Sequence, residues 1–406
     1  MSALASIKQL GELLSLEYGA ALPEQTRSGY GYPVFGSNGI VGHHDDFLIR
    51  GPGIVVGRKG SVGQVSWSNE SFWPIDTAYY VQARDGVDIR WLYWVLKHSR
   101  INELDAATGV PGLNRNDAYR LTSFTPDSDE QVRAASVLDT LDVAIDQNER
   151  LVAKLKQIRA GLLSDLLSKG IDDNGDIRDA QNESEFVTTP IGRLPRSWKM
   201  DKLLATADQT ENSFIDGDWI EAPHIRSEGV RLVQTGNIGI GKYLDKSDDK
   251  KFISQESFSA LRCKAILPGD VLICRLADPV GRACIVPDNL GSAITSVDVT
   301  IYRPDANRLA NSFIVCWLNT HGMLLRCSLL AAGTTRLRIS RTNLGGMLVP
   351  VPSIDEQREI ARILDSADAD IEAAESTREK LCQLKAGLTD DLLTGRVRVP
   401  AELEMA

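Results

Sequence analysis

One segment of this chain occurs twice. Residues 129–171 realign on residues 355–397 at a constant offset of 226 residues, with no gap and with 18 of 43 positions identical. Solenoid repeats recur every 20–50 residues or so, which makes this a duplicated module rather than a solenoid unit. The fold must therefore place two copies of one module within 406 residues.

Each copy has the sequence pattern of one long helix. Its apolar residues recur at alternating steps of three and four, which is the spacing of a coiled-coil seam. Arg159 and Lys385 are among the polar residues that interrupt the seam and would be costly in a dry core. Two similar half-apolar seams favour pairing within the chain, while a surface bundle or a dimerisation zipper is the alternative. The predicted seam comprises Leu141, Ile145, Leu155, Leu162, Leu166, Ile371, Leu381, Leu388 and Leu392.

Capping signals bound both predicted helices. The segments Ser128–Gln131 and Ser353–Glu356 each resemble a capping box just after a proline, Pro126 and Pro352. Gly170 and Gly395 are suited to the left-handed conformation that commonly ends a helix. About 40 residues at about 1.5 Å each predict a helix roughly 60 Å long.

The rest of the chain forms two globular segments rich in glycine and in short apolar runs. Gly53–Trp67, Asp270–Arg275 and Gly281–Pro287 have the pattern of strands and turns. Trp91–His98 and Ser312–Asn319 each predict a short buried helix or strand, at similar places before the long helices. The duplication is therefore expected to include the globular segments, and the fold class is α+β. The predicted order is a first globular domain (1–128), a helix (129–171), a polar linker or exposed hairpin (172–190), a second globular domain (191–353), a helix (354–397) and a tail (398–406).

The distribution of charge matters more here than its sum. The net charge of −10 argues against a nucleic-acid binder when it is taken alone. However, residues 355–397 hold 11 acidic and 6 basic residues, and so carry half of that charge. No acidic residue lies between Asp46 and Glu70, or between Asp305 and Asp355, and arginines occur in both stretches. Arginines in loops rich in Gly, Ser and Thr suit contacts with phosphate and guanine, although solvated basic loops are the alternative.

The motifs of catalysis and metal binding are missing from the sequence. It has no phosphate-binding Gly-x-x-x-x-Gly-Lys-Ser/Thr loop, no Gly-x-Ser-x-Gly and no Asn/Asp-Pro-Pro-Tyr/Phe of amino-methyltransferases. The six cysteines form no Cys-x-x-Cys pair, and the adjacent His43 and His44 would point apart on a strand. Neither a catalytic nor a metal site is predicted. Without a signal peptide or an apolar run of about 18 residues, a cytoplasmic protein that does not contact a membrane is expected.

Several motifs, in the same order in both halves, make the chain resemble the specificity (S) subunit of type I restriction-modification systems. The resemblance covers nearly the whole length. The long helices open with Pro-x-x-x-Glu-Gln and close with Gly-Leu-x-x-Asp-Leu-Leu. The other matching segments are Gly36–Gly42, Gly57–Gly63, Leu194–Trp198, Gly269–Arg275, Ala293–Thr300 and Gly333–Arg336, whereas Thr108–Leu113 departs from the family's Gly-Thr-Thr string.

This resemblance implies two target-recognition domains held apart by antiparallel helices, each domain reading one half of a split DNA sequence. It implies docking of two modification subunits that use S-adenosylmethionine, and of restriction subunits that use ATP and magnesium. The chain itself would hold no cofactor and catalyse nothing. The alternatives are a non-catalytic coiled-coil scaffold and a free-standing DNA-modifying enzyme with an unrecognised site. The predicted DNA-contacting residues are Ser37, Asn38, Arg58, Lys59, Ser61, Arg115, Gln234, Asn237, Arg275, Thr334, Thr335, Arg336, Arg338 and Arg341.

Overall fold

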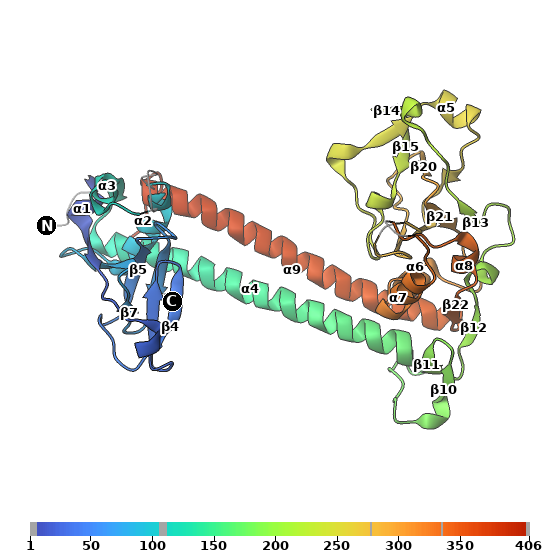
Figure 1. Ribbon diagram of the computed structural model, residues 1–406, viewed down its shortest axis with the longest axis horizontal. Coiled ribbons are helices and arrows are strands. Elements are labelled where there is room, and N and C mark those ends of the chain that lie inside the picture. The colour runs from blue at the N-terminus through green and yellow to red at the C-terminus, as the bar shows by residue number, and fades with distance from the viewer. Residues whose placement is uncertain (1–5, 105–111, 277, 334–335, 403–406) are drawn as a thin grey trace. The chain divides into compact units, whose positions relative to one another are not determined.

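The computed structural model describes residues 6–104, 112–276, 278–333 and 336–402. The chain divides into two compact units: unit 1 is residues 1–152 with 373–406, and unit 2 is residues 153–372. Two long helices, α4 (Ser128–Lys169) and α9 (Ile354–Thr394), each run unbroken and contribute residues to both units (Figure 1). Among the described residues, no helix is long and apolar enough to cross a membrane.

Unit 1 is built on a four-stranded antiparallel sheet in the order β2-β8-β5-β6. The short helix α2 packs on this sheet, with Trp91 and Trp94 fully buried. The same core includes Leu138 of α4 and Leu392 of α9, so both long helices belong to the unit's interior. The strands are β1 (Ser6–Gln9), β2 (Leu14–Tyr18), β3 (Tyr32–Gly36), β4 (Gly39–His44), β5 (Gly53–Gly57), β6 (Val65–Ser68), β7 (Trp73–Pro74), β8 (Ala78–Ala83) and β9 (Thr122–Thr125); the short helices are α1 (Leu10–Leu13), α2 (Ile89–His98) and α3 (Arg115–Arg120).

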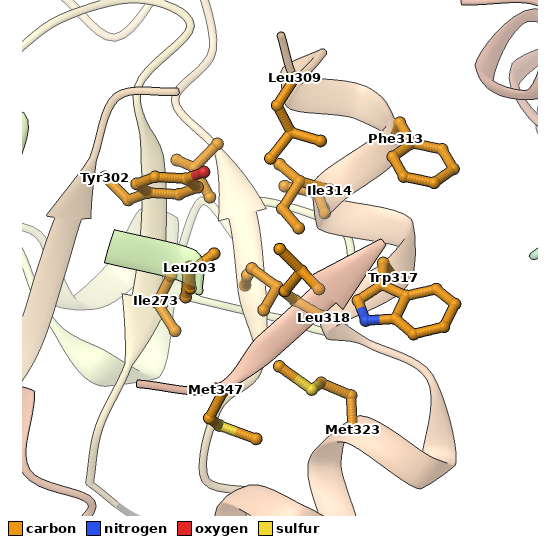
Figure 2. Packing of buried hydrophobic residues seen from close by; sticks show 14 of the residues in the cluster. Leu203, Ile273, Tyr302, Leu309, Phe313, Ile314, Trp317, Leu318, Met323 and Met347 are labelled. Carbon is orange, nitrogen blue, oxygen red and sulfur yellow. The ribbon is translucent and has the colours of Figure 1, made fainter. Parts of the chain in front are cut away.

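Unit 2 has a corresponding four-stranded antiparallel sheet, β13-β21-β18-β19, and a five-stranded sheet, β14-β16-β15-β20-β17. Its core packs α6 against the first sheet, as Ile314 and Leu318 show in Figure 2, whereas Phe313 packs against Trp198. The strands are β10 (Phe186–Thr189), β11 (Gly192–Pro195), β12 (Lys199–Lys202), β13 (Phe214–Asp216), β14 (Ile225–Arg226), β15 (Val230–Val233), β16 (Lys251–Ile253), β17 (Ala265–Ile266), β18 (Val271–Cys274), β19 (Ala283–Ile285), β20 (Ala293–Thr295), β21 (Val299–Tyr302) and β22 (Leu348–Val351). The short helices are α5 (Gln255–Ala260), α6 (Asn311–Leu318), α7 (His321–Leu329) and α8 (Arg341–Gly345).

The two units repeat one framework. Strand for strand, β2-β8-β5-β6 corresponds to β13-β21-β18-β19, and the pair β1-β9 corresponds to β12-β22. The helices α2 and α6 precede α4 and α9 in the same way. The α+β fold class and the extension of the duplication into the globular segments are confirmed. Unit 2 adds the five-stranded sheet, for which the described part of unit 1 has only the three strands β4-β3-β7.

Two polar residues in the predicted seam, Arg159 and Lys385, have partners across the helix pair. In unit 2, Arg159 of α4 binds Asp368 of α9 through Nε at 3.0 Å and Nη2 at 2.9 Å. In unit 1, Lys385 of α9 binds Asp142 of α4. The nine predicted seam leucines and isoleucines are all buried or half-buried, whereas Val143 is exposed. Within each unit the two helices are thus antiparallel neighbours joined by apolar contacts and an ion pair.

The helix ends differ from both predicted capping boxes, because neither Gln131 nor Glu356 closes its box; the Glu356 carboxylate accepts from Arg178 and the Ile171 N–H instead. Ser353 caps α9 by accepting from the Glu356 N–H at 3.3 Å, as predicted. At the start of α4, however, Asp127 and not Ser128 accepts, from the Glu130 N–H at 2.9 Å. The prediction for Gln131 was wrong, because this side chain accepts the Asp88 N–H at 2.9 Å instead. It therefore joins α4 to the start of α2 rather than closing a capping box.

Candidate nucleic-acid interface

A basic site in unit 1 is built where β5 ends. Arg58 follows this strand, and its backbone N–H donates to the Thr77 carbonyl at 3.0 Å. Its guanidinium lies 4.7 Å from the centre of the Tyr18 ring, at the end of β2. Arg115, the first residue of α3, lies 5.2 Å from the centre of the same ring. The side chains of two arginines from distant parts of the sequence thus meet at one tyrosine ring.

No carboxylate of the described residues neutralises the charges of this site. Arg58, Lys59 and Arg115 form no ion pair within 4.0 Å in the described part of the chain. They line a cavity of about 580 Å³ together with Tyr18, Tyr79, Gly112, Leu113, Asn114 and Asn116. The Tyr79 hydroxyl donates to the Leu113 carbonyl at 3.2 Å, and burial raises its pKa, so it is a neutral wall of the cavity. The arrangement suits an anion, and phosphate above all.

Three further predicted residues lie around the same loop. Ser37 and Asn38 form the turn between β3 and β4, and Ser61 lies in the turn after Lys59. A Cβ added at Gly57 would stand 2.5 Å from the Ser37 carbonyl oxygen and 2.1 Å from that of Ser61. Only glycine permits this close approach of the two turns. The structure therefore brings all six residues predicted for the first half into one region.

Unit 2 places arginines on the same framework but supplies carboxylates with them. Arg275 follows β18 and pairs with Asp216 through Nη2 at 3.1 Å. Arg338 pairs through Nε with Asp298 at 3.0 Å. Arg341, the first residue of α8, lies 3.9 Å from Asp216. Arg336 is exposed and forms no ion pair in the described residues.

Backbone hydrogen bonds establish which positions correspond. Leu113 N–H donates to the Arg58 carbonyl at 2.8 Å, as Ile339 N–H donates to the Arg275 carbonyl at 3.0 Å. Bridges join Lys59 with Gly112 and Leu276 with Arg338. By the same pattern, three further pairs of positions correspond: Tyr18 with Asp216, Thr77 with Asp298, and Arg115 with Arg341.

Two of the residues predicted to contact DNA, Arg275 and Asn237, are buried in unit 2. Arg275 is 3% exposed, and it donates to the Ile339 and Val297 carbonyls besides pairing with Asp216. Burial lowers the pKa of this guanidinium, and a direct DNA contact is not compatible with its place. Asn237 is also buried, and its amide is used within the loop, accepting from the Gln234 N–H and donating to the Leu244 carbonyl. Both side chains thus hold the loops around them together, and neither presents a free polar group at the surface.

Of the remaining predicted residues of the second half, the structure describes Gln234 but not Thr334 or Thr335. Gln234 is half-buried at the end of β15 and lies beside Asn237. Thr334 and Thr335 lie outside the described residues. Sequence reasoning missed Tyr18, Asp216 and Asp298. The globular segments have diverged so far that the backbone hydrogen bonds are needed to align these positions, and an acidic residue is not a sequence signal of a basic site.

Comparisons with known proteins agree on one family. The model of the type I restriction modification DNA specificity domain matches residues 5–157 and again residues 202–381. The MjaVIII type I restriction enzyme specificity subunit of Methanocaldococcus jannaschii is 22% identical over 370 residues, covering 89% of this chain and 81% of that protein. The EcoprrI specificity subunit of Escherichia coli is 28% identical over 141 residues, 33% of this chain and 35% of that protein.

Solved structures show the same fold. The S subunit of a type I restriction-modification system from M. genitalium superposes with a TM-score of 0.61 at 17% identity, covering 96% of both chains. The HsdS subunit from Thermoanaerobacter tengcongensis gives 0.51 at 18% identity, covering 98% of both chains. With two matches of the family model along its length, this chain belongs to the type I restriction modification DNA specificity family.

Proposed function

We propose that this chain reads a DNA target in two parts, one part with each unit, and directs methylation to it. The observation that carries this proposal is the pair of equivalent basic sites. Arg115 and Arg341 begin equivalent short helices, and each lies beside the loop that follows an equivalent strand. The same framework has different side chains at Tyr18 and Asp216, as expected of two sites that read different sequences.

The proposed contacts fall into two kinds. In unit 1, Arg58, Lys59 and Arg115 bind phosphates or guanine, and Ser37, Asn38 and Ser61 line the adjoining turns. In unit 2, Arg338 and Arg341 extend from the framework toward base edges, with Arg336 beside them. Gln234, Thr334 and Thr335 complete the proposed set. A guanidinium whose other edge is held by a carboxylate is pre-oriented, which favours bidentate reading of guanine.

The chain is proposed to act as a non-catalytic subunit. Methylation would be performed by two modification subunits holding S-adenosylmethionine, and cleavage by restriction subunits with ATP and magnesium. The acidic residues Glu375 and Glu379 of α9 are a proposed face for a basic patch on a modification subunit.

A competition experiment with DNA duplexes tests the proposal. The full chain, assembled with modification subunits, is offered a duplex that carries the methylated motif. Competitors have one half scrambled, the other half scrambled, or only the gap between the halves scrambled. Scrambling either half should weaken binding about a hundredfold or more, given a cost of about 1–3 kcal/mol per mismatched base pair, and scrambling the gap should not. If one half proves dispensable, the two-part reading is wrong.

A further inference from the structure

The two basic sites have the same backbone arrangement, but carboxylates lie beside the arginines in unit 2 and not beside the described cations of unit 1. In unit 1, three cations surround Tyr18 and its cavity without a carboxylate in salt-bridge distance among the described residues. In unit 2, Asp216 occupies the place of Tyr18, and Asp298 occupies the place of Thr77. Three of the four arginines there face one of these carboxylates, and Arg336 is the exception.

This difference has a consequence for DNA binding. A protein cation that neutralises a DNA phosphate releases counterions, and each such contact adds about 0.9 to the slope of log affinity against log salt concentration. A cation that already has a carboxylate partner brings less net charge to the phosphate and adds less to that slope. Arg338 is half-exposed, with Asp298 partly exposed beside it, so their pair lies at the surface that would meet DNA.

We propose that unit 1 supplies most of the salt-dependent affinity for the DNA backbone, whereas unit 2 discriminates bases with Arg338, which Asp298 neutralises and orients, and with Arg341, which lies beside the Arg275–Asp216 pair. Unit 1 is thus the anchor and unit 2 the more selective reader. The proposal rests on the proposed function, because it concerns the means by which each unit engages DNA.

The position shared by Thr77 and Asp298 offers a reciprocal test. Each residue's carbonyl accepts the N–H of the arginine after the strand, Arg58 at 3.0 Å and Arg275 at 2.8 Å. Asp298→Thr keeps that backbone bond and frees Arg338. Thr77→Asp places a carboxylate in the corresponding part of unit 1, which holds Arg58 and Lys59. Asp245→Asn, which frees Lys250 from a pair of 3.0 Å elsewhere in unit 2, controls for a change in total charge.

The measurement is the affinity of the full chain, assembled with modification subunits, for a duplex carrying the target and for one with both halves scrambled, across a salt series. We expect Asp298→Thr to steepen the slope of log affinity against log salt concentration by up to about 0.9. We also expect it to lower the ratio of the affinity for the target duplex to the affinity for the scrambled duplex. Thr77→Asp should flatten the slope by a similar amount and leave the ratio nearly unchanged. Asp245→Asn should alter neither.

Single substitutions of the cations provide an independent check. Lys59→Gln and Arg115→Gln should each flatten the slope by about 0.9, and Arg338→Gln should flatten it by less than half of that. Equal slope changes in both units, with binding intact, would overturn this inference and leave the proposed function standing. A wild-type assembly that does not distinguish target from scrambled duplex would overturn the proposed function itself.

Discussion

Glu356, in the first turn of α9, binds Arg178 at 2.5 Å, and both side chains are almost fully buried, at 9% and 12% exposed. The same Oε1 atom accepts the Ile171 N–H at 2.8 Å and the Trp198 indole N–H at 3.0 Å. One carboxylate thus fastens the start of α9 to the chain that leaves α4 and to the entry of the second globular segment.

The repeat provides the same fastening in unit 1. Glu130, in the first turn of α4, accepts from Arg398 Nε at 2.8 Å and from the Val399 N–H at 3.0 Å. Glu130 and Glu356 are separated by the repeat offset, whereas their partners Arg398 and Arg178 lie just beyond the repeated module and are not at that offset. In each unit, the start of one long helix is tied to the segment that follows the other.

Removal of the Glu356 carboxylate should strongly destabilise unit 2. Glu356→Ala leaves Arg178 buried without its counter-ion, and breaking a buried pair in this way costs about 3–5 kcal/mol. Denaturant unfolding followed by tryptophan fluorescence measures the loss. Glu359→Ala is the control, since Glu359 pairs with Arg362 on the exposed face of the same helix and should change stability little. Similar losses for both variants would show that the buried pair has no special role.

The corresponding carboxylate in unit 1 should make stability depend on pH. The Arg398 hydrogen bond is the main cause that holds the pKa of Glu130 below its usual value. A lowered folded-state pKa stabilises the protein above the unfolded-state pKa of about 4.3, and this contribution is lost as pH falls through that value toward the folded-state pKa. Glu130→Gln should be less stable than wild type at pH 7, and the difference should shrink between about pH 5 and pH 3. A difference that stays constant over this range would contradict the assignment.

The Arg159–Asp368 pair should hold the two long helices in register within unit 2. Both side chains are about a third exposed, at 28% and 31%, so the expected coupling energy is modest, about 1 kcal/mol. A double-mutant cycle with Arg159→Met and Asp368→Leu measures it. The exchanged variant, Arg159→Asp with Asp368→Arg, should recover part of the stability that Arg159→Asp loses. No recovery would mean that the surroundings, and not the pair, determine the preference for arginine at residue 159.

Base reading in unit 2 should depend on Arg336 and Arg338. Arg338→Ala or Arg336→Ala should cost about 1–3 kcal/mol of binding to the methylated target and relax a single half of it. Methylation of a plasmid library that contains every variant of both halves reports the relaxed position. Lys250→Ala, at a distance from the site in the sequence and paired with Asp245, is a matched control. Wild-type binding and an unaltered motif in both arginine variants would remove them from the set of contacts.

The long helices and their pairing could be predicted from the sequence because a duplicated 3-4 spacing has few other physical solutions. The residues Arg159 and Lys385 were recognised as costly, but their partners Asp368 and Asp142 lie more than 200 positions away and follow no local rule. The basic loops could be located by their lack of acidic neighbours along the chain. That criterion fails in three dimensions, because Asp298 lies outside the acid-free stretch that contains Arg338 and yet pairs with it.

The burial of Arg275 could not be predicted for a related reason. The segment Asp270–Arg275 has the pattern of strands and turns, but this pattern does not reveal that the Arg275 side chain lies between Asp216 and two backbone carbonyls. Burial of a charged residue depends on partners from other elements, which no local pattern reveals. In contrast, Arg58 at the equivalent place meets Tyr18, and its guanidinium stays partly accessible above the ring.

Mapping of methylated bases in the source strain, with this gene intact and with it deleted, tests the two-part reading most directly. The account predicts a methylated motif of two defined halves separated by an undefined gap, present only when the gene is intact. Restoring the gene with Arg338→Ala should bring the motif back with one half relaxed. A continuous, ungapped motif that depends on this gene would contradict the central claim.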